Sequence, residues 1–99
     1  MAEGPLRVVA RINAKFDKTD EVRDLLLALI EPTRKEPGCT TYELLQNRND
    51  LRDFTFVEEW ASGSAFDSHS ISDHIKALGP KLQPIVTEAP DIRIYSLVE

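Results

Sequence analysis

The sequence predicts an α+β domain with the element order β-α-β-β-α-β. Three observations support this prediction. Four short stretches are rich in β-branched and aromatic residues, and two stretches show the helical spacing of apolar residues. Two of the strand-like stretches are separated by only a short polar loop. Ninety-nine residues suit one domain, so we treat residues 1–99 as a single unit.

The first half of the chain predicts a strand followed by a helix. Residues 6–15, LRVVARINAK, alternate in the manner of a strand, and FDKTD then supplies turn residues with Thr19 or Asp20 as the helix N-cap. Pro32 should kink or loosen the last turn, and the EPG at 36–38 should end the helix. The apolar stripe of this helix consists of Val22, Leu25, Leu26, Leu29 and Ile30.

The middle of the chain predicts a β-hairpin. Residues 39–47, CTTYELLQN, and residues 53–61, DFTFVEEWA, have the composition of strands, and RNDLRD between them is polar. Because the connection is short, the two strands should pair antiparallel.

The second half predicts a broken helix and a last strand. A short helix should begin at Ser62 or Gly63, and the SISD at 70–73 should interrupt it and offer serine caps for a second helix. Residues 91–98, DIRIYSLV, form the final strand. The whole order is that of the split βαβ, or ferredoxin-like, fold, with helices on one face of a four-stranded antiparallel sheet. The second helical stripe consists of Ile75, Leu78, Leu82, Ile85 and Val86.

Strand alternation predicts which side chains face the helices and which face outward. The outer face carries apolar residues among arginines, which favours a homodimer formed through the sheet faces. The alternative is that β-branched residues occupy exposed strands through propensity alone. The face assigned to the helices carries Leu6, Val8, Ala10, Ile12, Phe54, Phe56, Glu58, Trp60, Ile92, Ile94, Ser96 and Val98. The outer face carries Val9, Val57, Tyr95 and Leu97, with Tyr42 and Leu44 as further candidates, among Arg7, Arg11, Asn13 and Arg93.

Charge and composition disfavour several classes of protein. The net charge is −5 and the basic residues are scattered, whereas nucleic-acid binding needs a concentrated positive surface. The apolar run LLLALI at 25–30 is too short to cross a membrane, and the N-terminus lacks the pattern of a signal peptide. The single cysteine, Cys39, cannot form an internal disulfide, so we expect a reducing cytoplasmic location.

The candidate site lies between residues 60 and 78, a segment that holds Trp60, His69 and His74. The two histidines are five residues apart, which on one continuous helix turns them roughly 140° from each other, so we expect no metal site. No G-x-S-x-G motif is present, and Cys39 has no base near it in sequence.

Acid–base chemistry is the remaining interpretation of this segment. His74 falls in a first helical turn, where the helix dipole favours a neutral, proton-accepting ring. Glu58, on the face assigned to the helices, should be paired or have its pKa raised by desolvation. The alternative is structural: Trp60 as core, His69 and His74 as helix-end side chains, and Glu58 as a hydrogen-bond partner within the fold.

Three segments form a recognisable set: PTRKEPGCTTYEL at 32–44, FTFVEEW at 54–60 and AFDSHSISDHIKAL at 65–78. Together they resemble the antibiotic biosynthesis monooxygenase (ABM) domain, and among its members the small stand-alone quinol monooxygenase type. The resemblance implies a dimeric α/β barrel and an oxygenase that needs no metal, flavin or haem. Its partners would be O₂ and a small aromatic, quinol or enol-type substrate. It implies acid–base roles for His69, His74 and Glu58, and substrate contacts for Trp60, Phe66, Phe56, Asn13 and Tyr42.

Two alternatives remain open at the level of the sequence. One is a dimeric small-ligand-binding or stress-associated module that keeps the fold without turnover. The other is a relationship to haem-degrading or metabolite-isomerising members of the same superfamily. Asn13 could match the strand-one Asn of the haem-degrading enzymes, but their helical Trp and His positions fall near His69 and Gly79 here.

Overall fold

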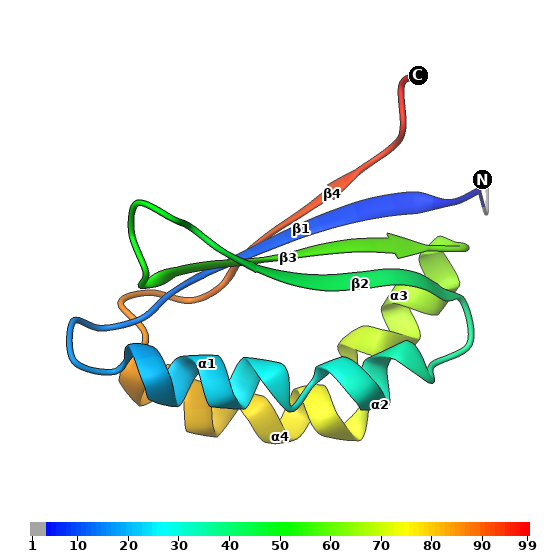
Figure 1. Ribbon diagram of the computed structural model, residues 1–99. Helices are drawn as coiled ribbons and strands as arrows, with labels where there is room; N and C mark the ends of the chain where they lie inside the picture. Colours follow the sequence, from blue (N-terminus) through cyan, green and yellow to red (C-terminus); the bar gives the residue numbers. More distant parts are fainter. Residues whose placement is uncertain (1–3) are drawn as a thin grey trace.

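The computed structural model describes residues 4–99 and consists of one sheet covered on one side by helices (Figure 1). This is the α+β, ferredoxin-like arrangement that the sequence predicts. The elements are β1 (Leu6–Asn13), α1 (Thr19–Leu27), α2 (Ile30–Arg34), β2 (Cys39–Gln46), β3 (Asp53–Trp60), α3 (Gly63–Ser70), α4 (Asp73–Leu82), a 3₁₀ turn (Gln83–Ile85) and β4 (Asp91–Tyr95).

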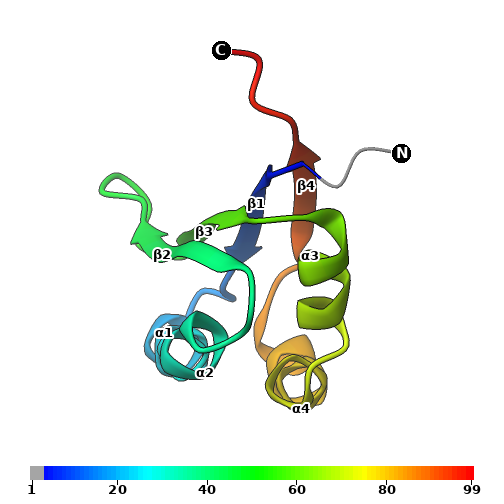
Figure 2. The ribbon, with the colours of Figure 1, turned by 90° about the vertical axis from the view of Figure 1, so that its right-hand side faces the viewer.

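The four strands are antiparallel neighbours in the order β2-β3-β1-β4. The predicted hairpin of β2 and β3 is confirmed, and β1 lies between β3 and β4. In the end-on view, α1 and α2 lie beneath one half of the sheet, and α3 and α4 lie beneath the other half (Figure 2). The candidate site lies between the sheet and the helices.

The pairing of β2 corrects one prediction about faces. Tyr42 pairs with Glu58 and Leu44 pairs with Phe56, so both lie on the helix face, and Tyr42 is fully buried. Their placement on the outer face was wrong because the register shifts between Cys39 and Thr41. Such an irregularity changes which residues share a face, and the composition of the strand does not reveal it.

Strand β4 is shorter and less covered than the sequence suggests. It ends at Tyr95, and the C-terminus leads away from the helices (Figure 1). Ile92 and Ile94 pair with Ala10 and Val8 and therefore share the helix face, yet they are 55% and 58% exposed. The prediction that the helices bury this strand is therefore wrong for a single chain.

The first helix breaks in two near Pro32, where the sequence predicts a kink or a looser last turn. Helix α1 ends at Leu27 and α2 begins at Ile30, because a proline at 32 has no N–H to donate to the carbonyl four residues before it. The N-cap of α1 is Lys18, not Thr19 or Asp20, and no side chain caps this end. Gly38 ends the segment as expected, with φ of +86°. A Cβ at position 38 would lie 2.5 Å from the Ala65 Cβ, so glycine also allows the close approach of α3.

The break between the last two helices is confirmed. Helix α3 begins after Ser62, whose Oγ accepts a hydrogen bond from the Ala65 N–H at 3.1 Å. It ends at Ser70, and α4 begins at Asp73. No helix within residues 4–99 is long and apolar enough to span a membrane.

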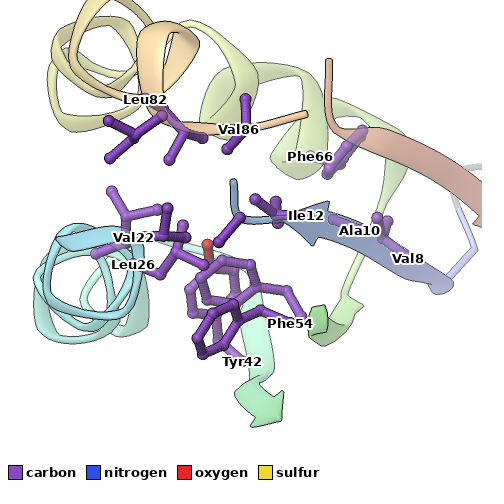
Figure 3. Close-up of a cluster of buried hydrophobic side chains, with 14 of the residues drawn as sticks. Val8, Ala10, Ile12, Val22, Leu26, Tyr42, Phe54, Phe66, Leu82 and Val86 are labelled. Atoms are coloured by element: carbon purple, nitrogen blue, oxygen red, sulfur yellow. The ribbon is translucent and has the colours of Figure 1, made fainter. Parts of the chain in front are cut away.

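The hydrophobic core lies between the sheet and the helices. Leu26 of α1 and Leu82 of α4 point toward each other from opposite helices, and Tyr42 and Phe54 contribute from the sheet (Figure 3). The largest fully buried side chain is that of Trp60, at the end of β3.

Candidate active site

A cavity of about 730 Å³ lies between the sheet and the helices. Its walls are mostly apolar, with a few polar side chains that point inward, which is the usual character of a small-molecule site. Figure 3 shows part of its apolar boundary, formed by side chains of β1, α1, α3 and α4. The residues that line it and matter below are Tyr42, Phe56, Glu58, Phe66, His69 and Leu82.

Glu58 is a buried carboxyl group in the wall of this cavity. Strand β3 directs it to the helix face, where it is only 3% exposed. Its Oε1 accepts a hydrogen bond from the Trp60 Nε1–H at 2.8 Å. Burial, with a smaller contribution from the charge of Glu36, raises the pKa of Glu58 to about 7, against the opposing effect of the Trp60 hydrogen bond. Near neutral pH this group can therefore be either a proton donor or an acceptor.

Replacing Glu58 with glutamine should change how stability depends on pH. Folded Glu58 holds its proton up to about pH 7, whereas the ordinary pKa is 4.5, so between these values the folded state binds more protons than the unfolded chain. The free energy of unfolding of the wild type should therefore fall as pH rises through this window. The wild type should lose on the order of 1–3 kcal/mol of unfolding free energy between pH 5 and pH 8, and Glu58→Gln should not show this loss.

Urea unfolding of both proteins at the two pH values measures this difference. Glu59→Gln is the matched control, since Glu59 is the next residue of β3 and lies on the other face. The control should keep the pH dependence of the wild type. An identical pH dependence in Glu58→Gln would contradict the raised pKa.

His69 lies in the last turn of α3 and is 5% exposed. Its ring packs on Trp60, with centroids 4.6 Å apart, and its Nδ1 is 2.8 Å from Oε2 of Glu36. Because a carboxylate can only accept, Nδ1 carries the hydrogen of this bond, and in the neutral ring Nε2 is left as an acceptor. The arrangement fixes both the tautomer and the orientation of a histidine in the cavity wall.

His74, in the first turn of α4, contacts the same carboxylate oxygen. Its Nε2 is 2.7 Å from Glu36 Oε2 and 3.3 Å from Ser72 Oγ. The Ser72 hydroxyl in turn donates to the His69 carbonyl at 2.7 Å. His74 is not among the described residues that line the cavity, and its side chain is 23% exposed. It therefore contacts the site through Glu36.

The two histidines converge, which the prediction from their spacing on one continuous helix did not allow. His69 lies at the end of α3 and His74 at the start of α4, so the turn between the helices brings the two rings together. Their ring centroids are 6.1 Å apart.

Sequence reasoning did not single out Glu36, which joins the two histidines. It is separated from them by 33 and 38 residues, so no local spacing relates these positions. Its one local signal is its place beside the Pro–Gly pair that ends α2 and turns the chain into β2.

The proposed substrate contacts fall into three groups. Phe56, Phe66 and Tyr42 line the cavity, and Tyr42 stacks on Phe56 with centroids 4.7 Å apart. Burial, followed by the charge of Glu58, raises the pKa of the Tyr42 phenol, which keeps it protonated. Trp60 is fully buried behind His69 and supports the wall without forming it. Asn13 pairs with Asp53 on the outer face of the sheet, so its position contradicts a contact with the cavity.

Comparison with known protein families gives one match that covers most of the chain. A model described as "Antibiotic biosynthesis monooxygenase" matches residues 5–80. Two curated proteins are similar in sequence. "Uncharacterized protein sll1783" of Synechocystis sp. is 31% identical over 98 residues, which is 99% of this chain and 67% of the relative. "Putative monooxygenase Rv0793" of Mycobacterium tuberculosis is 37% identical over 70 residues, which is 71% of this chain and 68% of the relative.

Solved structures agree with these matches. The structure of Rv0793 from Mycobacterium tuberculosis has a TM-score of 0.91 to this chain at 27% identity, and the match covers 97% of each chain. A conserved protein from Methanosarcina mazei Go1 has a TM-score of 0.86 at 35% identity, covering 94% of this chain and 92% of that one.

Proposed function

The chain belongs to the antibiotic biosynthesis monooxygenase family, and on that premise we propose that it is a cofactor-independent monooxygenase acting on a small aromatic, quinol or enol-type compound. The main support for the proposal is the position of His69 and its hydrogen bond to Glu36. It is buried in the wall of an apolar cavity, and Glu36 fixes its tautomer through Nδ1. A histidine held in this way is suited to act as a general base.

The proposed reaction begins with transfer of the substrate O–H proton to Nε2 of His69. The resulting anion is electron-rich and passes one electron to O₂, after which the two radicals combine to form a carbon–oxygen bond. When the O–O bond breaks, one oxygen stays on the substrate as a carbonyl. The other leaves as water with the O–H proton and the proton lost from the attacked carbon. The substrate supplies all the electrons, so the chain itself supplies binding, orientation and proton transfer.

Glu58 and the aromatic walls have supporting roles in this proposal. A protonated Glu58 can donate a hydrogen bond to the substrate oxygen, and the Trp60 N–H keeps the carboxyl group oriented. Phe56, Phe66 and Tyr42 offer flat surfaces to an aromatic ring. His74 acts as a positioning residue, because it contacts the same Glu36 oxygen as His69 and so holds that carboxylate in place.

Oxygen uptake by the purified protein tests this function. Menadiol-type quinols and a panel of phenols are incubated with the protein in the presence of a chelator, and O₂ consumption is followed against the rate without protein. We expect consumption of one O₂ for each substrate molecule. If no compound of the panel gives uptake while the same compounds still bind, the protein is a small-ligand-binding module that keeps the family fold without turnover.

We also propose that the active form is a homodimer joined through the outer faces of the sheets. Val9 and Val57 pair at the centre of this face and are half-buried, and the face continues onto the exposed Tyr95 of β4. Two such faces packed together would bury this apolar strip.

Placing a charge at the centre of this face should separate the two copies. Val57→Asp would bury a carboxylate against apolar side chains, so we expect the mass to fall from about twice 11.2 kDa to that of one chain. Sedimentation equilibrium measures the mass. Phe16→Asp is the control, because Phe16 is 85% exposed in the loop before α1 and should leave the mass unchanged. A wild type that sediments as a monomer would contradict the proposal.

We place the protein in the cytoplasm, as the sequence suggests. Support comes from Cys39, which is a free thiol and is suited to a reducing compartment.

A further inference from the structure

We propose that Glu36, His69 and His74 form a binding site for a divalent transition metal ion, for which Zn²⁺ is the best suited, and that the bound ion blocks the proposed base. The three side chains offer one ligand atom each, and these atoms all lie within 4.8 Å of one another. The ion would act as an inhibitor and not as a cofactor of the oxygenation.

The geometry needs only a small adjustment to accept the ion. Zinc binds imidazole nitrogen and carboxylate oxygen at about 2.0–2.2 Å, so tetrahedral ligand atoms lie roughly 3.3 Å apart. The two nitrogens are now 2.8 and 2.7 Å from the same Glu36 oxygen. Each of these two distances must therefore increase by roughly half an ångström. The two nitrogens already lie within 4.8 Å of each other.

The donor set selects the class of metal. Two imidazoles and one carboxylate suit zinc and similar first-row ions, whereas Mg²⁺ and Ca²⁺ prefer sites built from oxygen ligands. His69 is buried, and Glu36 and His74 have side chains that are 14% and 23% exposed, so the site is largely enclosed by protein and reaches solvent at Glu36 and His74. Three protein ligands and a water are the common zinc shell outside purely structural sites.

The hydrogen bonds already present hold the ligands close together. The Glu36 carboxylate accepts from both rings, so the metal would replace two N–H hydrogens that lie between the same atoms. The Ser72 hydroxyl donates to the His69 carbonyl, and its Oγ lies 3.3 Å from Nε2 of His74, which limits the movement of the turn between α3 and α4. A ligand set held together before binding loses less conformational freedom when the ion arrives.

Blocking of the base follows from which nitrogen binds the metal, and this part rests on the proposed function. The nitrogen of His69 that faces Glu36 is Nδ1. When Nδ1 binds the ion, the neutral ring carries its hydrogen on Nε2, which can then donate but cannot accept a proton. The substrate would keep its O–H proton, and oxidation would stop.

Binding of the metal alone tests the site without any assay of activity. Apo protein is titrated with Zn²⁺ in competition with a chromophoric chelator, and with Mg²⁺ as the contrasting ion. We expect one Zn²⁺ per chain and no binding of Mg²⁺. Glu36→Gln and His74→Ala should each weaken zinc binding by about 10–100-fold or more, the loss typical of changes even outside the ligand shell. Glu31→Gln is the matched control, because Glu31 is an exposed carboxylate in α2 and should leave binding unchanged.

The outcomes separate the site from the function. Absence of saturable zinc binding, or binding that both ligand variants retain, would overturn the site whatever the protein catalyses. If zinc binds as expected and the protein oxidises quinols, the rate should fall as the site fills and return when a chelator removes the ion. An unchanged rate of oxidation with the site filled would show that the bound ion does not block His69. If zinc binds and no quinol is oxidised, the site stands and the proposed function fails.

Discussion

Replacing His69 with alanine should lower kcat for quinol oxidation by about 10²–10⁴-fold, the usual contribution of a positioned general base. The substrate proton would then lose its proposed acceptor, because the ring that lines the cavity would be gone. KM should change much less than kcat, since the apolar walls that bind the ring remain. Steady-state O₂ uptake over a range of substrate concentrations separates the two constants.

The controls for this prediction compare the two histidines. His74→Ala should give a smaller loss of kcat, because His74 acts through Glu36 and His69 keeps its own bond to that carboxylate. Circular dichroism should show that both variants keep the native fold. If His69→Ala oxidises quinols at the full rate, His69 is not the base and the proposed mechanism is wrong.

Replacing Trp60 with alanine should cost about 3–5 kcal/mol of unfolding free energy, because Trp60 is the largest fully buried side chain. Its indole packs on His69 and on Phe66, with centroids 4.6 and 6.1 Å away, so truncation leaves a void at the end of β3. It also removes the N–H that Glu58 accepts, which leaves a buried carboxyl group without this donor. For a domain of this size each kcal/mol lowers Tm by about 4–8 °C.

Thermal and urea unfolding measure this loss, and two further variants define its origin. Phe16→Ala truncates an aromatic that is 85% exposed and should stay within about 0.5 kcal/mol of the wild type. Trp60→Phe keeps an aromatic ring against His69 but lacks the N–H, so it should fall between the wild type and Trp60→Ala. A loss below 1 kcal/mol in Trp60→Ala would show that Trp60 does not support the wall as described.

The order of the elements could be predicted because it depends on local pattern. The hairpin of β2 and β3 follows from two β-rich stretches and a short polar loop, and α3 begins at Gly63, one of the two predicted starts. Where a prediction failed, the missing information was not local. The faces of Tyr42 and Leu44 depend on a register shift within β2, and the exposure of Ile92 depends on how far the helices extend beneath β4.

By itself, the sequence determined the α+β fold class and the polar candidates His69, His74 and Glu58. Both follow from short-range periodicity and residue chemistry, which depend only on residues close together in the chain. The tertiary structure alone decided that Glu36 joins the two histidines and that Trp60 lies behind the wall. The physical reason is that such contacts depend on sheet register and on the packing of helices that are far apart in the chain. A spacing of five residues turns two side chains roughly 140° apart on a single helix. The same spacing brings His69 and His74 together because one helix ends and the next begins between them.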